Sequence, residues 1–220
     1  MTLADLRTRV LERIQENASS PGRWPAARID KYLNEGVRLM AVRSGALIGT
    51  ATIEAVAEQL RYELPRDCVQ VMGIVRRSPR EVVDPVGVRE LDATHPAWQT
   101  INGSRFEWYF VFGVQDIFLV PALSSGGEVY DLTYRQDPGD SSLVDDTDEP
   151  PLPRRYHEAL INYAISRALM INANEKRLET ATNAMQMFAT AIGGLRKATH
   201  RPPDRVHRMR EGDSAGGWVH

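Results

Sequence analysis

Helical periodicity occurs at both ends of the 220-residue chain, and about a hundred residues of strand-like sequence separate the two helical regions. Apolar residues spaced three and four apart predict a first helix near the N-terminus and a second from about Pro25 to Arg43. The same spacing predicts a third helix from about Tyr156 and a fourth that ends at Gly193-Gly194 or shortly after. The apolar stripes of these helices consist of Leu3, Leu6, Val10, Leu11 and Ile14, then Ile29, Leu33, Val37 and Met40, then Tyr156, Leu160, Tyr163, Ala164 and Ala168, and finally Leu178, Ala181, Met185, Phe188, Ile192 and Leu195. Because each pair of helices has one apolar face, the two pairs are expected to pack together as a four-helix bundle.

Between the helical pairs, β-branched and aromatic residues separated by turn signals run from about residue 50 to residue 136. Phe106, Trp108, Phe110 and Phe112 recur at every second position, which predicts a strand with one very apolar face. Residues 117–121 and 129–135 follow as its expected hairpin partners. The predicted fold class is therefore α+β: a four-helix bundle formed by N- and C-terminal helix pairs, a small, mostly antiparallel β domain inserted between them, and an extended C-terminal tail.

The changes of pattern predict four segments along the chain. These are an N-terminal helix pair at 1–46, the inserted β domain with an acidic linker at 47–149, a C-terminal helix pair at 150–197 and a flexible basic tail at 198–220. The residues expected in the bundle core are Leu33, Val37, Tyr156, Leu160, Tyr163 and Phe188.

The C-terminal segment from residue 196 onward contains Pro202-Pro203, three glycines and few apolar residues. Such a segment cannot offset its ordering entropy alone, so it is expected to be disordered until it meets a partner. The residues expected to contact that partner are Arg196, Lys197, Arg201, Arg205, Arg208, Arg210 and Trp218.

Composition excludes several classes of protein. A net charge of -2 argues against a generally basic nucleic-acid binder, although a local basic patch is compatible with it. Cys68 is the only cysteine, so an intramolecular disulfide and a thiol-ligated metal are excluded. The N-terminus lacks the apolar core of a signal peptide, and nowhere do roughly 18 apolar residues run together. We therefore expect no membrane association, and we expect synthesis in a cytoplasm.

His157-Glu158 is the dipeptide closest to a metalloprotease motif. A zincin helix needs a second histidine four residues after the first, and Ile161 stands there, so His157 is interpreted as a surface histidine in the first turn of a helix. His95 has no partners at the spacing of a catalytic triad, and neither a P-loop nor a dinucleotide fingerprint is present. The acidic residues at 145–149 are interpreted as a solvated linker rather than a calcium loop. No catalytic, cofactor-binding or metal-binding residue is predicted, and no enzymatic activity.

The aromatic strand at 106–112 has two interpretations. Exposed rings beside basic residues would form a base-stacking platform, whereas buried rings would form part of a core. Only Arg105 and Glu107 accompany the rings, which favours the core.

Several short segments, in order, are similar to a known family. The segments are "WPAARIDKYLNEGVRLM", "LRYELPRDCVQVMGIVRR", "DIFLVPA", "YDLTYRQDP" and "PLPRRYHEALINYAISRAL". This order resembles the head-to-tail adaptor proteins of tailed bacteriophages over about 190 residues, leaving only the tail unmatched.

The resemblance implies a structural protein of the virion, at the head-tail junction. It implies a ring of copies of this chain, commonly twelve, beneath the portal protein, through which double-stranded DNA passes without sequence-specific contacts. It further implies a tail or neck protein on the distal side, and docking of the C-terminal extension on the portal. An alternative from the residues themselves is a regulatory nucleic-acid-binding protein that uses the basic tail.

Overall fold

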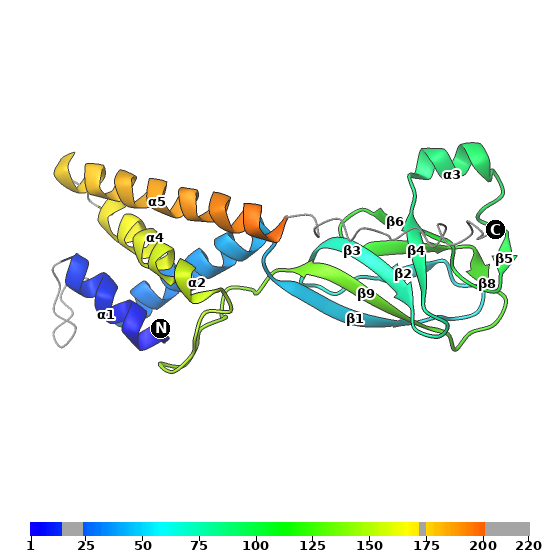
Figure 1. Ribbon diagram of the computed structural model, residues 1–220, viewed down its shortest axis with the longest axis horizontal. Helices are drawn as coiled ribbons and strands as arrows, with labels where there is room; N and C mark the ends of the chain where they lie inside the picture. Colours follow the sequence, from blue (N-terminus) through cyan, green and yellow to red (C-terminus); the bar gives the residue numbers. More distant parts are fainter. Residues whose placement is uncertain (15–23, 172–174, 201–220) are drawn as a thin grey trace, which may run out of the picture.

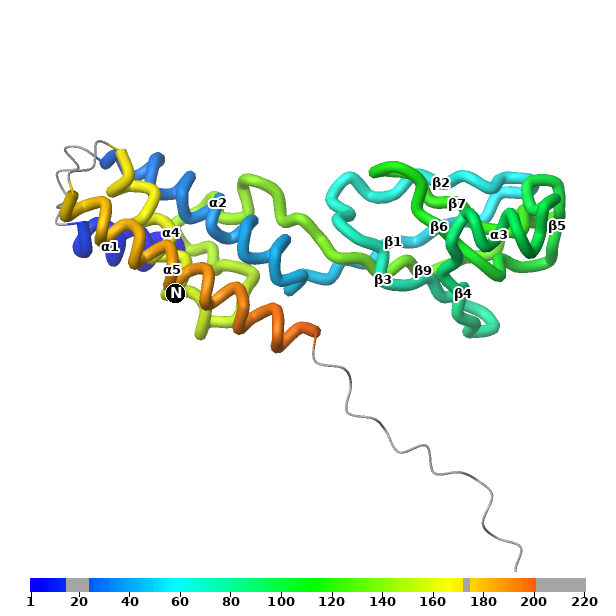
Figure 2. Tube along the Cα trace, turned by 90° about the horizontal axis from the view of Figure 1, so that it is seen from above, coloured from blue at the N-terminus to red at the C-terminus, as the bar shows by residue number. Residues whose placement is uncertain are grey.

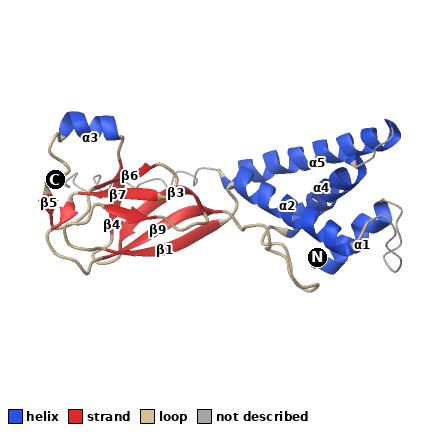
Figure 3. Cartoon of the chain, turned by 180° about the vertical axis from the view of Figure 1, so that it is seen from behind, coloured by secondary structure: helices blue, strands red, loops and turns tan. Residues whose placement is uncertain are grey.

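The computed structural model describes residues 1–14, 24–171 and 175–200. The molecule is elongated, with a group of helices at one end and a β-sheet at the other (Figure 1). Figure 3 shows the same separation by colour, since α3 is the one described helix that lies at the sheet end. The α+β class predicted from the sequence is confirmed.

The helical group contains segments from both ends of the chain. Its members are α1 (Leu3–Arg13), α2 (Ala26–Ser44), the short 3-10 turn η1 (Arg154–Tyr156), α4 (His157–Met170) and α5 (Glu175–Thr199). A capping box starts α1, because the Thr2 side chain accepts from the Asp5 N–H and the Asp5 carboxylate accepts from the Thr2 N–H. At the end of α2, Gly45 adopts a φ of 63°, a left-handed conformation that glycine takes without strain.

Side chains from all four long helices form one hydrophobic cluster. Leu33, Val37, Leu160, Tyr163 and Phe188 are buried in this cluster, whereas Tyr156 is half-buried at its margin. The helix axes are inclined to one another rather than parallel (Figure 1). A regular four-helix bundle therefore stays a prediction, while the shared core of the four helices is an observed feature.

Helix α2 packs tightly on α4 at Gly36. A Cβ atom at this position would lie 3.0 Å from Cδ1 of Tyr163, closer than side chains normally pack. Tight packing against Tyr163 therefore explains why the "YLNEG" segment has glycine at this position.

The α5 helix differs from its prediction in two respects. It runs through Gly193-Gly194 and ends at Thr199, so residues 196–199, expected to belong to a disordered tail, are helical. Its buried stripe consists of Ala181, Ala184, Phe188, Ile192 and Leu195. Leu178 was expected on this inner side but is 52% exposed, because at about 100° of rotation per residue it falls beside the stripe.

The sheet contains seven strands and is larger than the small β domain expected. Its order is β1 (Ile48–Glu54), β9 (Val129–Gln136), β3 (Cys68–Arg76), β4 (Glu81–Pro85), β6 (Trp108–Phe112), β7 (Asp116–Val120) and β2 (Arg61–Glu63). All neighbours are antiparallel except β4 and β6, so the prediction of a mostly antiparallel sheet is confirmed. A separate pair joins β5 (Asn102–Gly103) to β8 (Ala122–Leu123).

Strand β6 is covered on both faces, which the alternating pattern did not predict. Tyr109 belongs to the main core of the curled sheet, and Phe110 belongs to a second core with Trp98 beneath the short helix α3 (Val88–Thr94). Phe112, expected on the buried face, is 61% exposed because β6 ends there in a hairpin beyond both cores. The prediction of one apolar face running from Phe106 to Phe112 is therefore wrong at its C-terminal end.

Candidate interaction surfaces

The end of α5 is fixed beside the junction between the helical group and the sheet, where residues 45–47 lead from α2 into β1; we call this junction the waist. The Thr199 hydroxyl donates to the Ser44 carbonyl oxygen at 2.8 Å, which ties the last turn of α5 to the last turn of α2. His200 lies against the guanidinium of Arg135, and Arg135 donates to Oε1 of Gln70 at 2.9 Å. The chain therefore leaves the helical group at a defined point next to strands β3 and β9.

The residues predicted to contact a partner are divided by this point. Arg196 and Lys197 lie in the last turns of α5, and both are exposed. The remaining predicted residues, Arg201, Arg205, Arg208, Arg210 and Trp218, lie outside the described residues.

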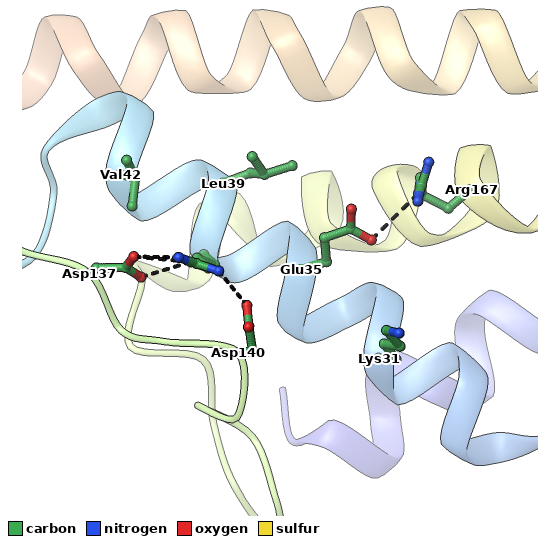
Figure 4. Close-up of a pocket in the computed structure, with 8 residues that line it drawn as sticks. Lys31, Glu35, Leu39, Val42, Asp137, Asp140 and Arg167 are labelled. Atoms are coloured by element: carbon green, nitrogen blue, oxygen red, sulfur yellow. Dashed lines mark hydrogen bonds and ion pairs between the residues drawn. The ribbon is translucent and has the colours of Figure 1, made fainter. Parts of the chain in front are cut away.

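A groove of about 790 Å³ follows the face of α2 near the waist. It is lined by Lys31, Glu35, Arg38, Leu39 and Val42 of α2, by Asp137 and Asp140 of the acidic segment that follows β9 (residues 137–149), and by Arg167 of α4. Figure 4 shows Val42, Asp137 and Asp140 at one end and Lys31, Glu35 and Arg167 at the other, with Leu39 between them. The groove thus has an aliphatic middle and charged ends.

The charged ends of the groove carry opposite signs. At the waist end, Arg38 binds both carboxylate oxygens of Asp137 and donates to Asp140 at 2.6 Å, so two carboxylates face one guanidinium. These bonds, first from Asp137 and then from Asp140, raise the pKa of the Arg38 guanidinium. Burial acts to raise the pKa of Asp137, but the bonds from Arg38 and from the Gly139 N–H bring it below its ordinary value.

At the far end of the groove, two cations accompany one carboxylate. Arg167 pairs with Glu35 at 3.5 Å, and Lys31 is exposed beside them. Tyr163 lies beneath this end, where burial first and its bond to Glu35 second raise the pKa of its hydroxyl. The far end is therefore net positive and the waist end net negative.

The acidic segment after β9 is packed against the helices through its backbone and Leu143, while the side chains of Asp145, Asp146 and Glu149 are exposed, as expected of a solvated linker. Asn34 of α2 is buried, and its side chain donates to the Leu143 carbonyl at 2.9 Å and accepts from the Leu143 N–H at 2.8 Å. The Leu143 side chain is buried in the helical core. Farther along, the carbonyl oxygens of Asp148 and Asp146 accept from the first N–H groups of α1. The segment is held because backbone and side-chain groups distant in sequence satisfy each other's hydrogen bonds.

His157 is buried, with 1% of its surface exposed, so its interpretation as a surface histidine is wrong. The preceding turn folds over the first residue of α4, and Nε2 donates to the Leu152 carbonyl oxygen at 3.0 Å. Nδ1 is buried without a hydrogen-bond partner among the described residues. Burial is the main cause that lowers the pKa of this imidazole, and the bond to Leu152 opposes it. His157 therefore belongs to the core.

The aromatic side chains around β6 pack on one another rather than forming an open platform. Phe110 stacks on Phe118 with ring centroids 5.0 Å apart, and Trp98 meets Phe110 edge-on at 5.4 Å. The exposed Phe112 contacts Phe118 edge-on at 5.9 Å. Most of these rings therefore pack against one another inside the sheet end of the molecule, as expected if the aromatic strand forms part of a core.

No cluster of three or more histidine, cysteine, aspartate or glutamate side chains suited to a metal ion occurs within residues 1–14, 24–171 and 175–200. Within the same ranges, no helix is long and apolar enough to cross a membrane. Cys68 is a free, half-buried thiol whose pKa is raised by burial and by the neighbouring Asp67.

The groove on α2 was not predicted from the sequence. A weak sign of this groove in the sequence is a second face of α2, on which charged residues at helical spacing accompany Leu39. These charged residues are Lys31, Glu35 and Arg38. Nothing in the sequence indicates that Asp137, a hundred residues later, returns to Arg38, since this pairing depends on the path of the whole sheet.

The family comparison agrees with the resemblance seen in the sequence. The model of the SU10 adaptor protein family matches residues 1–209. A search of curated proteins found no match.

Proposed function

The chain belongs to the SU10 adaptor protein family, and from this membership we propose that it is a structural head-to-tail adaptor of a tailed phage that forms a ring under the portal. The family is one of phage adaptors, so a structural role in the virion and association with portal and tail proteins follow in general terms. The finer proposal is that the ring extends the DNA channel and attaches the next tail component. The family match over residues 1–209 is the observation that carries this proposal.

The two-part shape supports an adaptor. The helical group and the sheet stand at opposite ends of a long molecule, so one copy presents two separate surfaces to two different neighbours (Figure 1). Each end has its own hydrophobic core, which keeps both surfaces rigid while they are bound. We assign the helical group to the ring wall.

The C-terminal segment is proposed to dock on the portal. Arg196 and Lys197 begin a run of basic residues that leaves the helical group at the anchored end of α5. Arg201, Arg205, Arg208, Arg210 and Trp218 continue that run in the sequence. The expected partner surface is an acidic groove on the portal, because cationic side chains need complementary carboxylates for specific docking.

The test of this proposal mixes the full-length protein with the portal ring of the same phage. Electron microscopy of the mixture is expected to show a ring of adaptor copies on one face of the portal. A chain ending at residue 200 should fold as the full chain does and lose docking. Normal docking of the truncated chain would refute the role of the C-terminal segment, and absence of any portal complex with the full chain would refute the adaptor proposal.

A DNA-binding assay separates this proposal from the nucleic-acid alternative. Binding to duplex DNA that shows sequence preference, and that weakens log-linearly with salt, is the result expected of a regulatory DNA-binding protein. The adaptor proposal expects weak binding without sequence preference. The packed rings around β6 favour the adaptor, because base stacking needs exposed aromatic faces.

A further inference from the structure

The outward face of α5 is unusual for an exposed helix. From Thr180 to Leu195 the sequence contains no charged residue, although the helix buries only a narrow stripe. Asn183, Gln186 and Thr190 lie opposite that stripe and are exposed. Exposed helix faces normally carry lysine and glutamate, so four turns without charge indicate a face that another protein surface covers.

Two further features of α5 point the same way. Gly193 and Gly194 lie within the helix, where glycine is less favourable than alanine, and a Cβ atom at either position would meet no atom within 4 Å. The described part of the chain therefore gives no packing reason for them. Met187 is 60% exposed at the side of the same face. Close approach of a second backbone would account for the glycines and cover the methionine.

The outward face of α5 carries one charge at each end of its uncharged part, and the C-terminal one is complementary to the waist end of the groove on α2. Glu179 and Lys197 are separated by five helical turns and so share this face, one before and one after its uncharged part. In the groove, the end near Lys31 is net positive and the end near Asp140 is net negative, with aliphatic side chains between them. With the helices running in the same direction, Lys197 at the C-terminal end of the outward face is complementary to the net negative waist end of the groove. Glu179 lies about 27 Å before Lys197 along α5, whereas Lys31 lies only about 10 Å before Arg38 along α2, so Glu179 extends beyond the Lys31 end.

Both helices run toward the waist, because the last turns of α2 and α5 are joined by the bond from Thr199 to Ser44. Copies related by rotation about an axis along the molecule keep this common direction, so α5 of one copy would lie parallel to α2 of the next. Figure 2 shows α2 and α5 along different sides of the helical group. A contact between two different faces is heterologous and propagates from copy to copy until a ring closes.

We propose that the C-terminal part of the outward face of α5, ending at Lys197, binds in the α2 groove of a neighbouring copy of this chain. This inference rests on the proposed ring-forming adaptor and assigns its subunit contact. Lys197 of one copy faces Asp140 of the next, and Gly194 allows the two helices to approach. This contact takes Lys197 out of the portal-docking run and leaves docking to Arg196 and the basic residues that follow.

The test uses charge reversal in the full-length protein, alone and with the portal ring, with assembly followed by sedimentation velocity and mass photometry. Lys197→Glu and Asp140→Lys are each expected to raise the concentration needed for half-assembly at least tenfold. An equimolar mixture of the two variants should assemble like the wild type, because alternating copies restore opposite charges at every contact. A contact within one chain cannot be restored by mixing.

A steric variant tests the same contact without charge. Gly194→Met is expected to raise the melting temperature of the protomer, since methionine favours helix over glycine, and to abolish assembly. Ala189→Met, on the exposed flank of α5 opposite Gly194 and Met187, is the matched control and should assemble normally. If the wild type forms rings and Lys197→Glu, Asp140→Lys and Gly194→Met do so equally well, the assigned contact is refuted while the adaptor function stands. If the wild type forms no ring, alone or on the portal, the adaptor proposal itself fails.

Discussion

Replacing Asn34 with alanine should loosen the acidic segment and destabilise the whole helical group. The Asn34 side chain satisfies both backbone groups of Leu143, at 2.9 and 2.8 Å, in a site where Asn34 is only 6% exposed. Leaving a buried backbone group without a partner costs about 1–3 kcal/mol, so two such groups predict a loss of about 2–4 kcal/mol, after allowance for partial rehydration. For a chain of this size the melting temperature should fall by about 5–10 °C.

Urea denaturation measures the loss of free energy, and hydrogen exchange at the Leu143 amide locates it. Ser142→Ala is the matched control, because it removes only the peripheral bond of the Ser142 hydroxyl to Asn34, at 3.2 Å, and should cost less than about 1 kcal/mol. The reasoning would be refuted if Asn34→Ala unfolded within about 1 kcal/mol of the wild type and left exchange at Leu143 unchanged.

Three further predictions concern other parts of the molecule. Burial lowers the folded-state pKa of His157, so the stability that the neutral imidazole contributes should be complete above the unfolded-state pKa near 6.5. As the pH falls below that value, the free energy of unfolding should decrease by at most about 1.4 kcal/mol per pH unit. His157→Gln should flatten this pH dependence in urea titrations from pH 7 to pH 5. Leu160→Ala should cost about 2–5 kcal/mol in thermal or urea unfolding because the side chain is fully buried, and a loss under 1 kcal/mol would contradict the shared helical core. Phe112→Ser should change stability by less than about 1 kcal/mol, since the ring is mostly exposed, and a larger drop in melting temperature would show that the hairpin end belongs to the core.

The predictions of burial that were wrong, for Phe112, His157 and Leu178, have a common physical origin. Periodicity reports which side of an element is apolar, but not how many sides are covered. Phe112 follows the alternation of Trp108 and Phe110 yet lies beyond both cores of the sheet end. His157 has a polar side chain at the start of a helix, and only the fold of the preceding turn shows that it is buried. Leu178 has helical spacing to Ala181 but falls outside the narrow stripe that α4 and α2 cover.

The candidate surfaces could be predicted only in part. The basic character of the C-terminal run is visible in the composition, and so is the absence of charge from Thr180 to Leu195. The α2 groove was missed because its negative end comes from Asp137 and Asp140, which are distant from Arg38 in the chain. Pairings across that separation leave no local pattern.

By itself, the sequence determined the local and compositional features of this protein: helices at both ends, strands between them, the α+β class and the resemblance to phage adaptors. These depend on short-range regularities, such as apolar residues at a spacing of three and four or at every second position. The tertiary structure alone decided that the acidic segment is clamped by Asn34 and Arg38, that α5 ends against Ser44, and that a groove with ends of opposite charge forms on α2. These features need groups about a hundred or more residues apart to meet, and such meetings are set by the packing of the whole chain rather than by any one segment of it.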